Sequence, residues 1–345
     1  MKKSILFGAL GVFMIGCFST VYAEQYVMKL GLIIPIMKGL HFASTPDEDF
    51  AKRVERMSKG RIKVELHPAS ALGGPRSLLV QSKKGIVQGC DAEGAYLSYF
   101  LPQAQVISLP YIFRSEEVAW RVLDLDGPFM KDFNKNFTKK TGLRIIALGE
   151  NSGGFRHFSN NKRVIKNPAD MKGLKIRTMR LPIHLEMVKY LGASPTPIGW
   201  AELYTALQTG VVDGEEQGIS GFRFGRHEEV QKYVTLDGHV YAIYCLMLNN
   251  AWFEKLPKDL QEVVTHCGRV FSVLSRGISQ YNLYKDLEYL QSKGMEFYTP
   301  TEEEKNQFKS LVCDKVLDYA RKQIGAEWVD KILKAIAEAE KELGY

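Results

Sequence analysis

The stretch Gly210-Val211-Val212-Asp213-Gly214-Glu215-Glu216 decides the fold, because an earlier stretch, Gly85-Ile86-Val87-Gln88-Gly89-Cys90-Asp91, repeats its pattern. Each stretch follows a helical segment and reads as a glycine helix cap, a short apolar strand, a second glycine and acidic residues. A strand pattern lies upstream of each, at residues 61–66 and 174–177. One unit is therefore used twice, about 125 residues apart, and we expect two similar lobes.

Strands and helices alternate along the chain, which predicts α/β architecture with mostly parallel sheets. Residues 27–34 read as a strand. Thr45, Pro46 and Glu48 form a helix-start signature, with a cap hydroxyl, an early proline and a glutamate three residues on. Ligands of open parallel sheets bind beyond the carboxyl ends of the strands. Two such sheets facing each other would line a cleft with those ends.

Residues 256–345 read as mostly helical. Pro257 suits a helix start, and Thr301 with Glu304 forms a capping box. We expect these helices to pack across the back of the lobes. The first lobe is predicted to contain residues 24–151 and about 243–283, and the second lobe residues 152–242 and about 284–345 with the C-terminal helices.

The N-terminal residues have the features of a secretory signal peptide. Two lysines are followed by an apolar run from residue 5 to about 18, and Val21-Tyr22-Ala23 offers small residues at the positions that signal peptidase inspects. We predict that residues 1–23 are a signal peptide cleaved after Ala23, so that the mature protein is periplasmic. One alternative is an uncleaved anchor, although the apolar run is shorter than the ~20 residues of a span. Another is a lipoprotein signal with Cys17 lipidated, which Met14 fits poorly.

The composition argues against nucleic acid as a partner. The formal charge of +7, which loss of the two signal-peptide lysines would lower by two, is modest, and basic residues are interleaved with acids. The later cysteines show neither a CxxC pair nor metal-ligand spacing. Buried free thiols are favoured over disulfides for Cys90, Cys245, Cys267 and Cys313.

The short motifs of common enzyme classes are absent. The chain has no GxxxxGK[ST] phosphate loop, no GxGxxG after a strand, no HExxH and no GxSxG. His184 and Glu186 form an HxE, but no PCxxC follows, so the zinc deaminase pattern is incomplete. The absence of these motifs does not exclude catalysis, but it removes the enzyme hypotheses that rest on a short motif. We expect a protein that is not an enzyme and that uses no cofactor and no metal.

Several segments carry a family resemblance. They are Asn151-Ser152-Gly153-Gly154-Phe155-Arg156, residues 169–177, 191–197 and 202–216, a lysine-glycine-arginine turn at 59–61, His67-Pro68 and Leu72-Gly73-Gly74. Together they resemble the solute-binding proteins of tripartite ATP-independent periplasmic (TRAP) transporters of the DctP type. The resemblance covers nearly the whole mature chain, and its most specific parts are residues 170–177 and 192–214.

The resemblance implies a two-lobed fold like that of periplasmic binding proteins, with crossing strands and a long helix joining the lobes. It further implies that the lobes close on a small organic acid, and that the ligand passes to a membrane permease driven by an ion gradient. We expect a monomer. Two alternatives stay open: a module that senses a ligand and reports to a membrane kinase, and an exported enzyme that would have to use Glu93, Glu215 or Glu216.

Arg177 is the principal candidate for ligand binding. It follows the apolar strand residues 174–176, so its guanidinium is expected at the carboxyl end of a strand, and its planar fork suits a carboxylate. The family's main carboxylate-binding arginine aligns with it. Arg156 matches a second family arginine that contacts the ligand or steadies the site; from the sequence alone it is an arginine after a Gly-Gly turn.

Four further residues complete the predicted substrate-binding site. Trp200 matches an aromatic family position and could cover an apolar ligand body or stack on Arg177. Gln217 stands where many family members carry asparagine, and this departure leaves the ligand in doubt. Glu93 aligns with an acidic position that binds a ligand hydroxyl, amine or water, or is a solvated carboxylate. Tyr96 is a weaker candidate.

Three other residues are given smaller roles. His41, in a loop after the first strand, is a weak candidate for the site, and Tyr241 and Tyr244 are expected in the core. The sequence does not choose between two ligand types. A monocarboxylate with an apolar or aromatic body suits Trp200, whereas a dicarboxylate would use both arginines.

Overall fold

A computed structural model describes residues 25–345. The predicted signal peptide, its cleavage site and the lipoprotein alternative at Cys17 lie outside these residues. In the part of the chain that is described, no helix has both the length and the apolar character needed to cross a bilayer.

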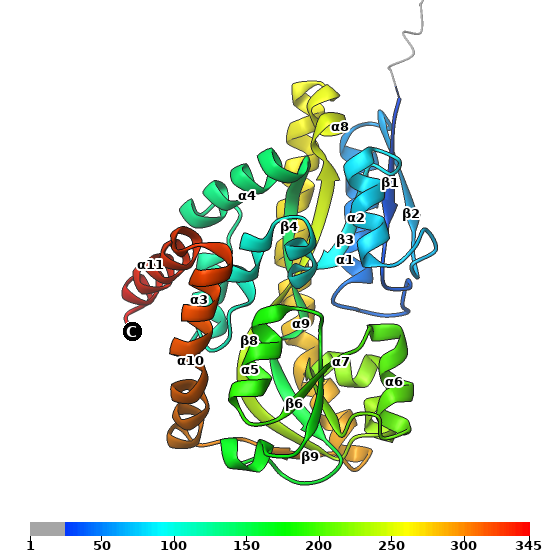
Figure 1. The fold of residues 1–345 in the computed structure, drawn as a ribbon. Coiled ribbons are helices and arrows are strands. Elements are labelled where there is room, and N and C mark those ends of the chain that lie inside the picture. Colours follow the sequence, from blue (N-terminus) through cyan, green and yellow to red (C-terminus); the bar gives the residue numbers. More distant parts are fainter. Residues whose placement is uncertain (1–24) are drawn as a thin grey trace, which may run out of the picture.

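Two βαβαβ units lie at opposite ends of one mixed sheet (Figure 1). The first contains β1 (Tyr26–Gly31), α1 (Ser44–Met57), β2 (Ile62–His67), α2 (Pro75–Lys84) and β3 (Gly89–Glu93). The second contains β5 (Lys175–Thr178), α5 (Pro182–Tyr190), β6 (Ser194–Pro197), α6 (Trp200–Gln208) and β7 (Gly214–Gly218). Within each unit the strands are parallel, and the first strand lies between the other two. The duplication expected from the sequence is present.

Two long antiparallel strands join the units. They are β4 (Leu143–Asn160) and β8 (Tyr233–Asn249), and they give the sheet order β2-β1-β3-β8-β4-β7-β5-β6, with the short β9 (Glu296–Tyr298) beside β8. The 35-residue helix α9 (Lys258–Ser292) runs along β4 and contacts α1 in the first unit and α7 (Ile219–Phe224) next to the second. These are the crossing strands and the long helix that the family resemblance implied.

A layer of helices covers one side of the crossing strands (Figure 1). It contains α3 (Glu116–Val122), α4 (Pro128–Thr141), α10 (Glu302–Ile324) and α11 (Ala326–Leu343), together with the 3₁₀ helices η1 (Gly94–Tyr99) and η2 (Pro102–Ser108). The capping box predicted from Thr301 and Glu304 is present at the start of α10. The remaining short helices are α8 (Asn250–Lys255), η3 (Pro168–Met171) and η4 (His227–Glu229).

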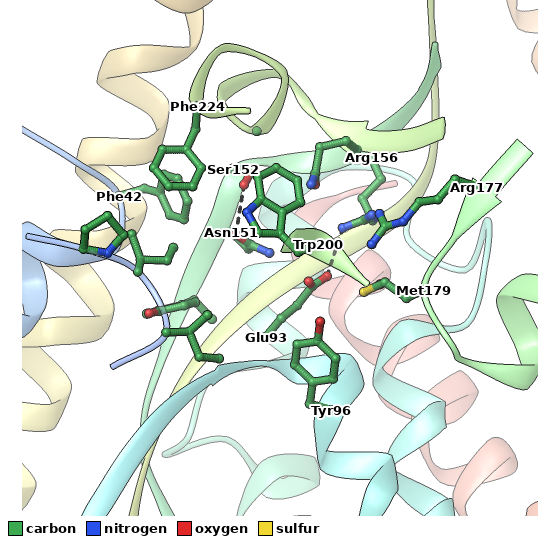
Figure 2. A pocket seen from close by; sticks show the side chains of 16 residues that line it. Phe42, Glu93, Tyr96, Asn151, Ser152, Arg156, Arg177, Met179, Trp200 and Phe224 are labelled. Atoms are coloured by element: carbon green, nitrogen blue, oxygen red, sulfur yellow. Dashed lines mark hydrogen bonds and ion pairs between the residues drawn. The ribbon is translucent and has the colours of Figure 1, made fainter. Parts of the chain in front are cut away.

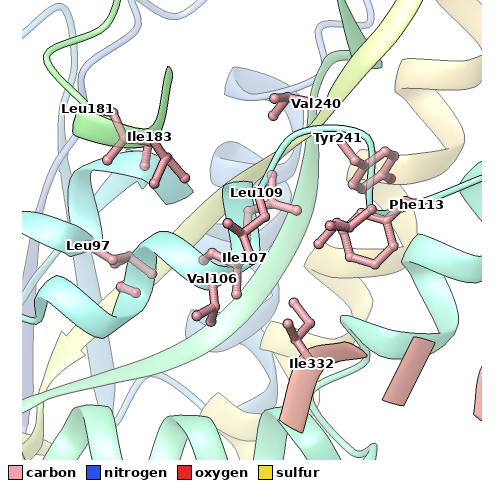
Figure 3. Close-up of a cluster of buried hydrophobic side chains, with 14 of the residues drawn as sticks. Leu97, Val106, Ile107, Leu109, Phe113, Leu181, Ile183, Val240, Tyr241 and Ile332 are labelled. Carbon is pink, nitrogen blue, oxygen red and sulfur yellow. The ribbon is translucent and has the colours of Figure 1, made fainter. Parts of the chain in front are cut away.

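The main hydrophobic core lies between this helical layer and the crossing strands. Figure 3 shows side chains of η1 and η2 meeting Leu181 and Ile183 from the start of α5, Tyr241 from β8 and Ile332 from α11. A second core packs α1 and α9 onto β1, β2 and β8. The exact lobe boundaries given above stay a prediction.

The apolar pair of each repeated stretch does not form the predicted strand. Ile86 and Val211 are 61% and 54% exposed. Both follow a helix-ending glycine in the left-handed region, Gly85 or Gly210, so they lie in the turn. The strands β3 and β7 begin at the second glycine and carry the acidic residues.

Two further details differ from the sequence prediction. The sequence analysis matched the strand at residues 61–66 with the strand at residues 174–177. In the sheet, the first of these is β2, and its counterpart is β6. The second is β5, and its counterpart is β1. The predicted cap at Thr45 is also wrong, because α1 begins at Ser44. The Thr45 hydroxyl accepts a hydrogen bond from the backbone N–H of His41 at 2.9 Å, and so fixes the preceding loop.

Candidate functional site

A cavity of about 120 Å³ lies where β4 meets the carboxyl ends of strands from both units (Figure 2). That volume is below the 300–1,000 Å³ typical of pockets for drug-sized ligands, so it suits a small molecule. All six residues predicted for substrate binding line it, and they come from six different elements: Glu93, Tyr96, Arg156, Arg177, Trp200 and Gln217. Their roles in binding stay predictions.

Arg156 is fully buried and held by two carboxylates. Its Nε pairs with Glu216, its Nη2 donates to the Glu216 carbonyl oxygen at 2.6 Å, and its Nη1 donates to Glu93 Oε1 at 2.9 Å. Burial alone would lower the pKa of Arg156, but Glu216 and Glu93 raise it. Burial likewise opposes ionisation of Glu216, yet Arg156 and His239 hold its pKa well below the ordinary value. The pair is therefore ionised.

A break in β4 shapes the floor of the pocket. Ser152, Gly153 and Gly154 all have positive φ, and pairing with β8 shifts register between Glu150 and Phe155. Because the chain turns here, Asn151 and Ser152 line the cavity. Gly218 lets β7 approach this break, since a Cβ at that position would lie 2.3 Å from the Ser152 carbonyl oxygen.

Arg177 is also buried, at 2% exposure, but it has fewer partners. Its Nε donates to the Ile198 carbonyl oxygen at 2.9 Å, which orients the guanidinium. Its Nη1 lies 3.7 Å from Glu215 Oε2, and Glu215 also pairs with His227. Neither Nη atom donates a hydrogen bond to another residue within 25–345. These N–H groups can therefore bind an oxyanion in the cavity.

Glu93, at the end of β3, and Tyr96, in η1 directly after it, face the arginines (Figure 2). Burial raises the pKa of Glu93, although Arg156 opposes the shift. Burial, with Glu93 nearby, raises the pKa of Tyr96 to about 12. The Tyr96 hydroxyl is thus protonated at neutral pH and can donate a hydrogen bond.

The sequence analysis considered two arrangements for Trp200, stacking on Arg177 or covering an apolar ligand body. Trp200 does not stack on Arg177. It lies nearly parallel to Phe224, with an interplanar angle of 8° and ring centroids 5.9 Å apart. In Figure 2 the two arginines lie toward one side of the pocket and Phe42 and Phe224 toward the other, with Trp200 between them. The cavity therefore has a cationic end and an aromatic end.

Several lining residues were not predicted from the sequence. Most of these residues are apolar. The apolar ones are Ile33, Ile34, Pro35, Phe42, Met179 and Phe224. Ile33 and Ile34 lie two and three residues beyond the end of β1, so the argument that ligands bind beyond the carboxyl ends of strands would have pointed to them. Tyr244 is buried as expected, yet it also lines the cavity, and its hydroxyl donates to Asp91.

His41 has a structural role. Its Nδ1 accepts hydrogen bonds from the backbone N–H groups of Ala43 and Ser44, each at 3.3 Å, at the start of α1. Burial lowers its pKa to about 4, so the ring is neutral and can accept them. Within the described residues no metal-binding cluster occurs, and Cys90, Cys245, Cys267 and Cys313 are free thiols.

The sequence and the structure both match known proteins. The family model for bacterial extracellular solute-binding proteins, family 7 (DctP), matches residues 42–323. A solute-binding protein of Verminephrobacter eiseniae is 36% identical over 248 residues, which cover 72% of each chain. The 2,3-diketo-L-gulonate-binding periplasmic protein YiaO of Escherichia coli is 27% identical over 342 residues, which cover 99% of this chain and 100% of that protein.

Among solved structures, the sugar acid-binding protein DctPAm of Advenella mimigardefordensis, in complex with galactonate, superposes with a TM-score of 0.83. It is 28% identical, and the match covers 92% of this chain and 99% of that one.

Proposed function

Because the chain belongs to the DctP family of extracellular solute-binding proteins, family 7, we propose that it captures a small organic acid in the periplasm and delivers it to the permease subunits of a TRAP transporter. The site would be formed by Arg177, Arg156, Trp200, Gln217, Glu93 and Tyr96. The mature protein would begin after Ala23 and act as a monomer. Two relatives support an acid as ligand, since YiaO is named for 2,3-diketo-L-gulonate and DctPAm was solved with galactonate.

The buried guanidinium of Arg177 is the observation that carries this proposal. A buried charge is unfavourable unless it is paired and hydrogen-bonded. Arg177 has one backbone hydrogen bond and one carboxylate at 3.7 Å, and its Nη groups face the cavity. A ligand carboxylate would complete this pairing through two parallel hydrogen bonds.

The carboxylates that an enzyme could use are already engaged. Glu93 and Glu216 pair with Arg156, and Glu215 lies between Arg177 and His227. Their positions suit the neutralisation of buried cations better than proton transfer to a substrate. This arrangement favours binding over catalysis.

Arg177→Ala should weaken binding of the cognate acid at least ~100-fold, which corresponds to about 2.7 kcal/mol. The ligand is first found by a thermal-shift screen of small organic acids, with neutral and cationic analogues as controls, because a ligand well above its Kd raises the Tm. Isothermal titration calorimetry then compares the variants. Arg180→Ala is the matched control, because Arg180 is exposed and lies outside the cavity lining. Retained affinity in Arg177→Ala would contradict the assignment.

A further inference from the structure

Of the two arginines that line the pocket, only Arg177 has guanidinium nitrogen atoms that donate no hydrogen bond to another described residue. Arg156 uses Nε, Nη1 and Nη2 in bonds to Glu216 and Glu93. Among residues 25–345, Arg177 donates a hydrogen bond through Nε alone, and its Nη1 has Glu215 at 3.7 Å, beyond hydrogen-bond distance. One carboxylate can therefore be bound by a guanidinium without displacing an existing ion pair.

A second carboxylate would meet negative charge. Glu93 lines the cavity, and Glu215 and Glu216 lie behind the two arginines. Glu215 and Glu216 also contact His227 and His239, so Glu93 is the carboxylate that a dianion would meet in the cavity. A dianion would have to compete with Glu93 for Arg156, and like charges at close range disfavour that.

Few polar groups in the cavity lack a partner. The Ser152 hydroxyl donates to Asn151 Oδ1 at 2.9 Å, Gln217 Oε1 accepts from Gly218 N–H at 3.0 Å, and the Tyr244 hydroxyl donates to Asp91. The Tyr96 hydroxyl and the Gln217 amide nitrogen make no hydrogen bond to another described residue. A ligand with many hydroxyl groups would bury most of them unpaired, which is unfavourable.

The rest of the lining is apolar. Ile33, Pro35 and Phe42 come from the loop after β1, and Met179, Trp200 and Phe224 come from the other side of the cavity. Trp200 is fixed by its parallel contact with Phe224. A flat or branched hydrocarbon body can pack against these side chains and lose water on both sides.

We infer that the ligand is a monocarboxylate with a compact apolar body, and not a dicarboxylate or a polyhydroxylated sugar acid. Its carboxylate pairs with Arg177, its body packs on Trp200 and Phe42, and at most one or two polar substituents meet Tyr96 and Gln217. This inference rests on the proposed function and narrows it. It sets the chain apart from YiaO and DctPAm, whose named ligands are sugar acids.

Two sets of acids with equal carbon number test the inference by calorimetry on the mature protein. Butyrate, succinate and erythronate form the four-carbon set, hexanoate, adipate and gluconate form the six-carbon set, and benzoate adds a flat body. We expect the apolar member to bind at least ~10-fold more tightly than the other two in its set. A dicarboxylate or sugar acid that binds as tightly as the apolar member of its set, or more tightly, overturns the inference but leaves the proposed function standing. If none of these acids binds, the inference is overturned as well, and the wider screen above then tests the proposed function alone.

Glu93→Gln tests the charge argument separately. Glutamine keeps an oxygen that can accept from Arg156 Nη1 but removes the negative charge. The affinity for succinate relative to butyrate should rise at least ~10-fold in this variant. An unchanged ratio would show that the charge of Glu93 does not select against dianions.

Discussion

Arg156 and Arg177 lie in one pocket, yet their partners give them different roles. Arg156 is neutralised within the protein by Glu216 and Glu93, so its charge is balanced whether or not a ligand is bound. Arg177 forms one ion pair within residues 25–345, with Glu215 at 3.7 Å from its Nη1. Under the proposed function a ligand would gain most from Arg177, whereas Arg156 connects β4 to β7 and to the end of β3.

Asp91 supports the same pocket from behind. It is fully buried in β3, its Oδ1 accepts from the Ile33 N–H at 2.8 Å, and its other oxygen accepts from the Tyr244 hydroxyl. Burial raises its pKa to about 7, against the lowering effect of these hydrogen bonds. The folded state thus holds a proton on Asp91 at pH values where the unfolded chain has released it.

Asp91→Asn should become more stable relative to the wild type as the pH rises from 5 to 8. A raised folded pKa gives the wild type a stabilising contribution at low pH, which is lost as the pH rises toward about 7. Asparagine keeps an acceptor for Ile33 and cannot ionise. The change in the difference between the two free energies of unfolding should be on the order of 2 kcal/mol, measured by urea denaturation at each pH.

The exposed Glu303→Gln variant is the control for the loss of one negative charge. A difference between Asp91→Asn and the wild type that stays constant from pH 5 to 8 would mean that Asp91 is already ionised at the lower pH.

Single residues show what the sequence could and could not reveal. Arg177 was predicted just past a strand, but it lies within β5. It could still be singled out, because apolar residues precede it and it matches a family motif. The partners of Arg156 could not, because Glu93 and Glu216 are 63 and 60 residues away along the chain. Trp200 was predicted, but Phe42 and Phe224 at the aromatic end of the cavity were missed, because an apolar residue has the same sequence pattern whether it lines a cavity or a core.

At the scale of elements, the close contact between α9 and β4 depends on a glycine. A Cβ on Gly268 would lie 2.1 Å from the Ile146 carbonyl oxygen, which is a backbone atom and cannot rotate away. Ile146 lies at a register irregularity of β4, between Ile145 and Ala147. Gly268 therefore allows the long helix to rest on the crossing strand, and α9 connects the two units through this strand.

Gly268→Ala should destabilise the protein by about 1–3 kcal/mol, the usual range for overpacking a filled core. The intrinsic preference of alanine for helices, worth up to ~1 kcal/mol, opposes this loss. Gly277→Ala is the matched control in the same helix, because a Cβ there meets nothing within 4 Å. It should stabilise by roughly 0.5–1 kcal/mol. Equal effects of the two substitutions on the urea midpoint would contradict the packing argument.

Elements were predicted unevenly. The C-terminal helices and the capping box at Thr301 followed from local signals, which is why they were found. The prediction placed β3 and β7 too early in the sequence, because it assigned Ile86 and Val211 to strands. Both residues are apolar but lie in exposed turns. Acidic residues occupy the strands themselves, since Glu216 has Arg156 as a partner across the sheet. That pairing is long-range, and no local pattern contains it.

At the scale of the whole molecule, the cavity is made by both units and by the strand that crosses between them. Glu93 belongs to the first unit, Tyr96 to η1 directly after it, Arg177 and Trp200 to the second unit, and Arg156 to β4. Under the proposed function, a ligand could contact all of these residues together only when the units are close. A ligand can stabilise the closed arrangement only by the difference between its binding free energies for the closed and the open arrangement.

Saturation with a cognate acid should therefore reduce the radius of gyration, as measured by small-angle X-ray scattering on the mature protein. The Arg177→Ala variant at the same acid concentration should keep the radius of the ligand-free protein, because it loses the contact that distinguishes the closed state. Arg180→Ala should contract like the wild type, since Arg180 is exposed. If calorimetry showed full occupancy while the radius of gyration stayed constant, the units would already be closed before binding. Arg177 would then contribute to affinity without driving any movement of the units.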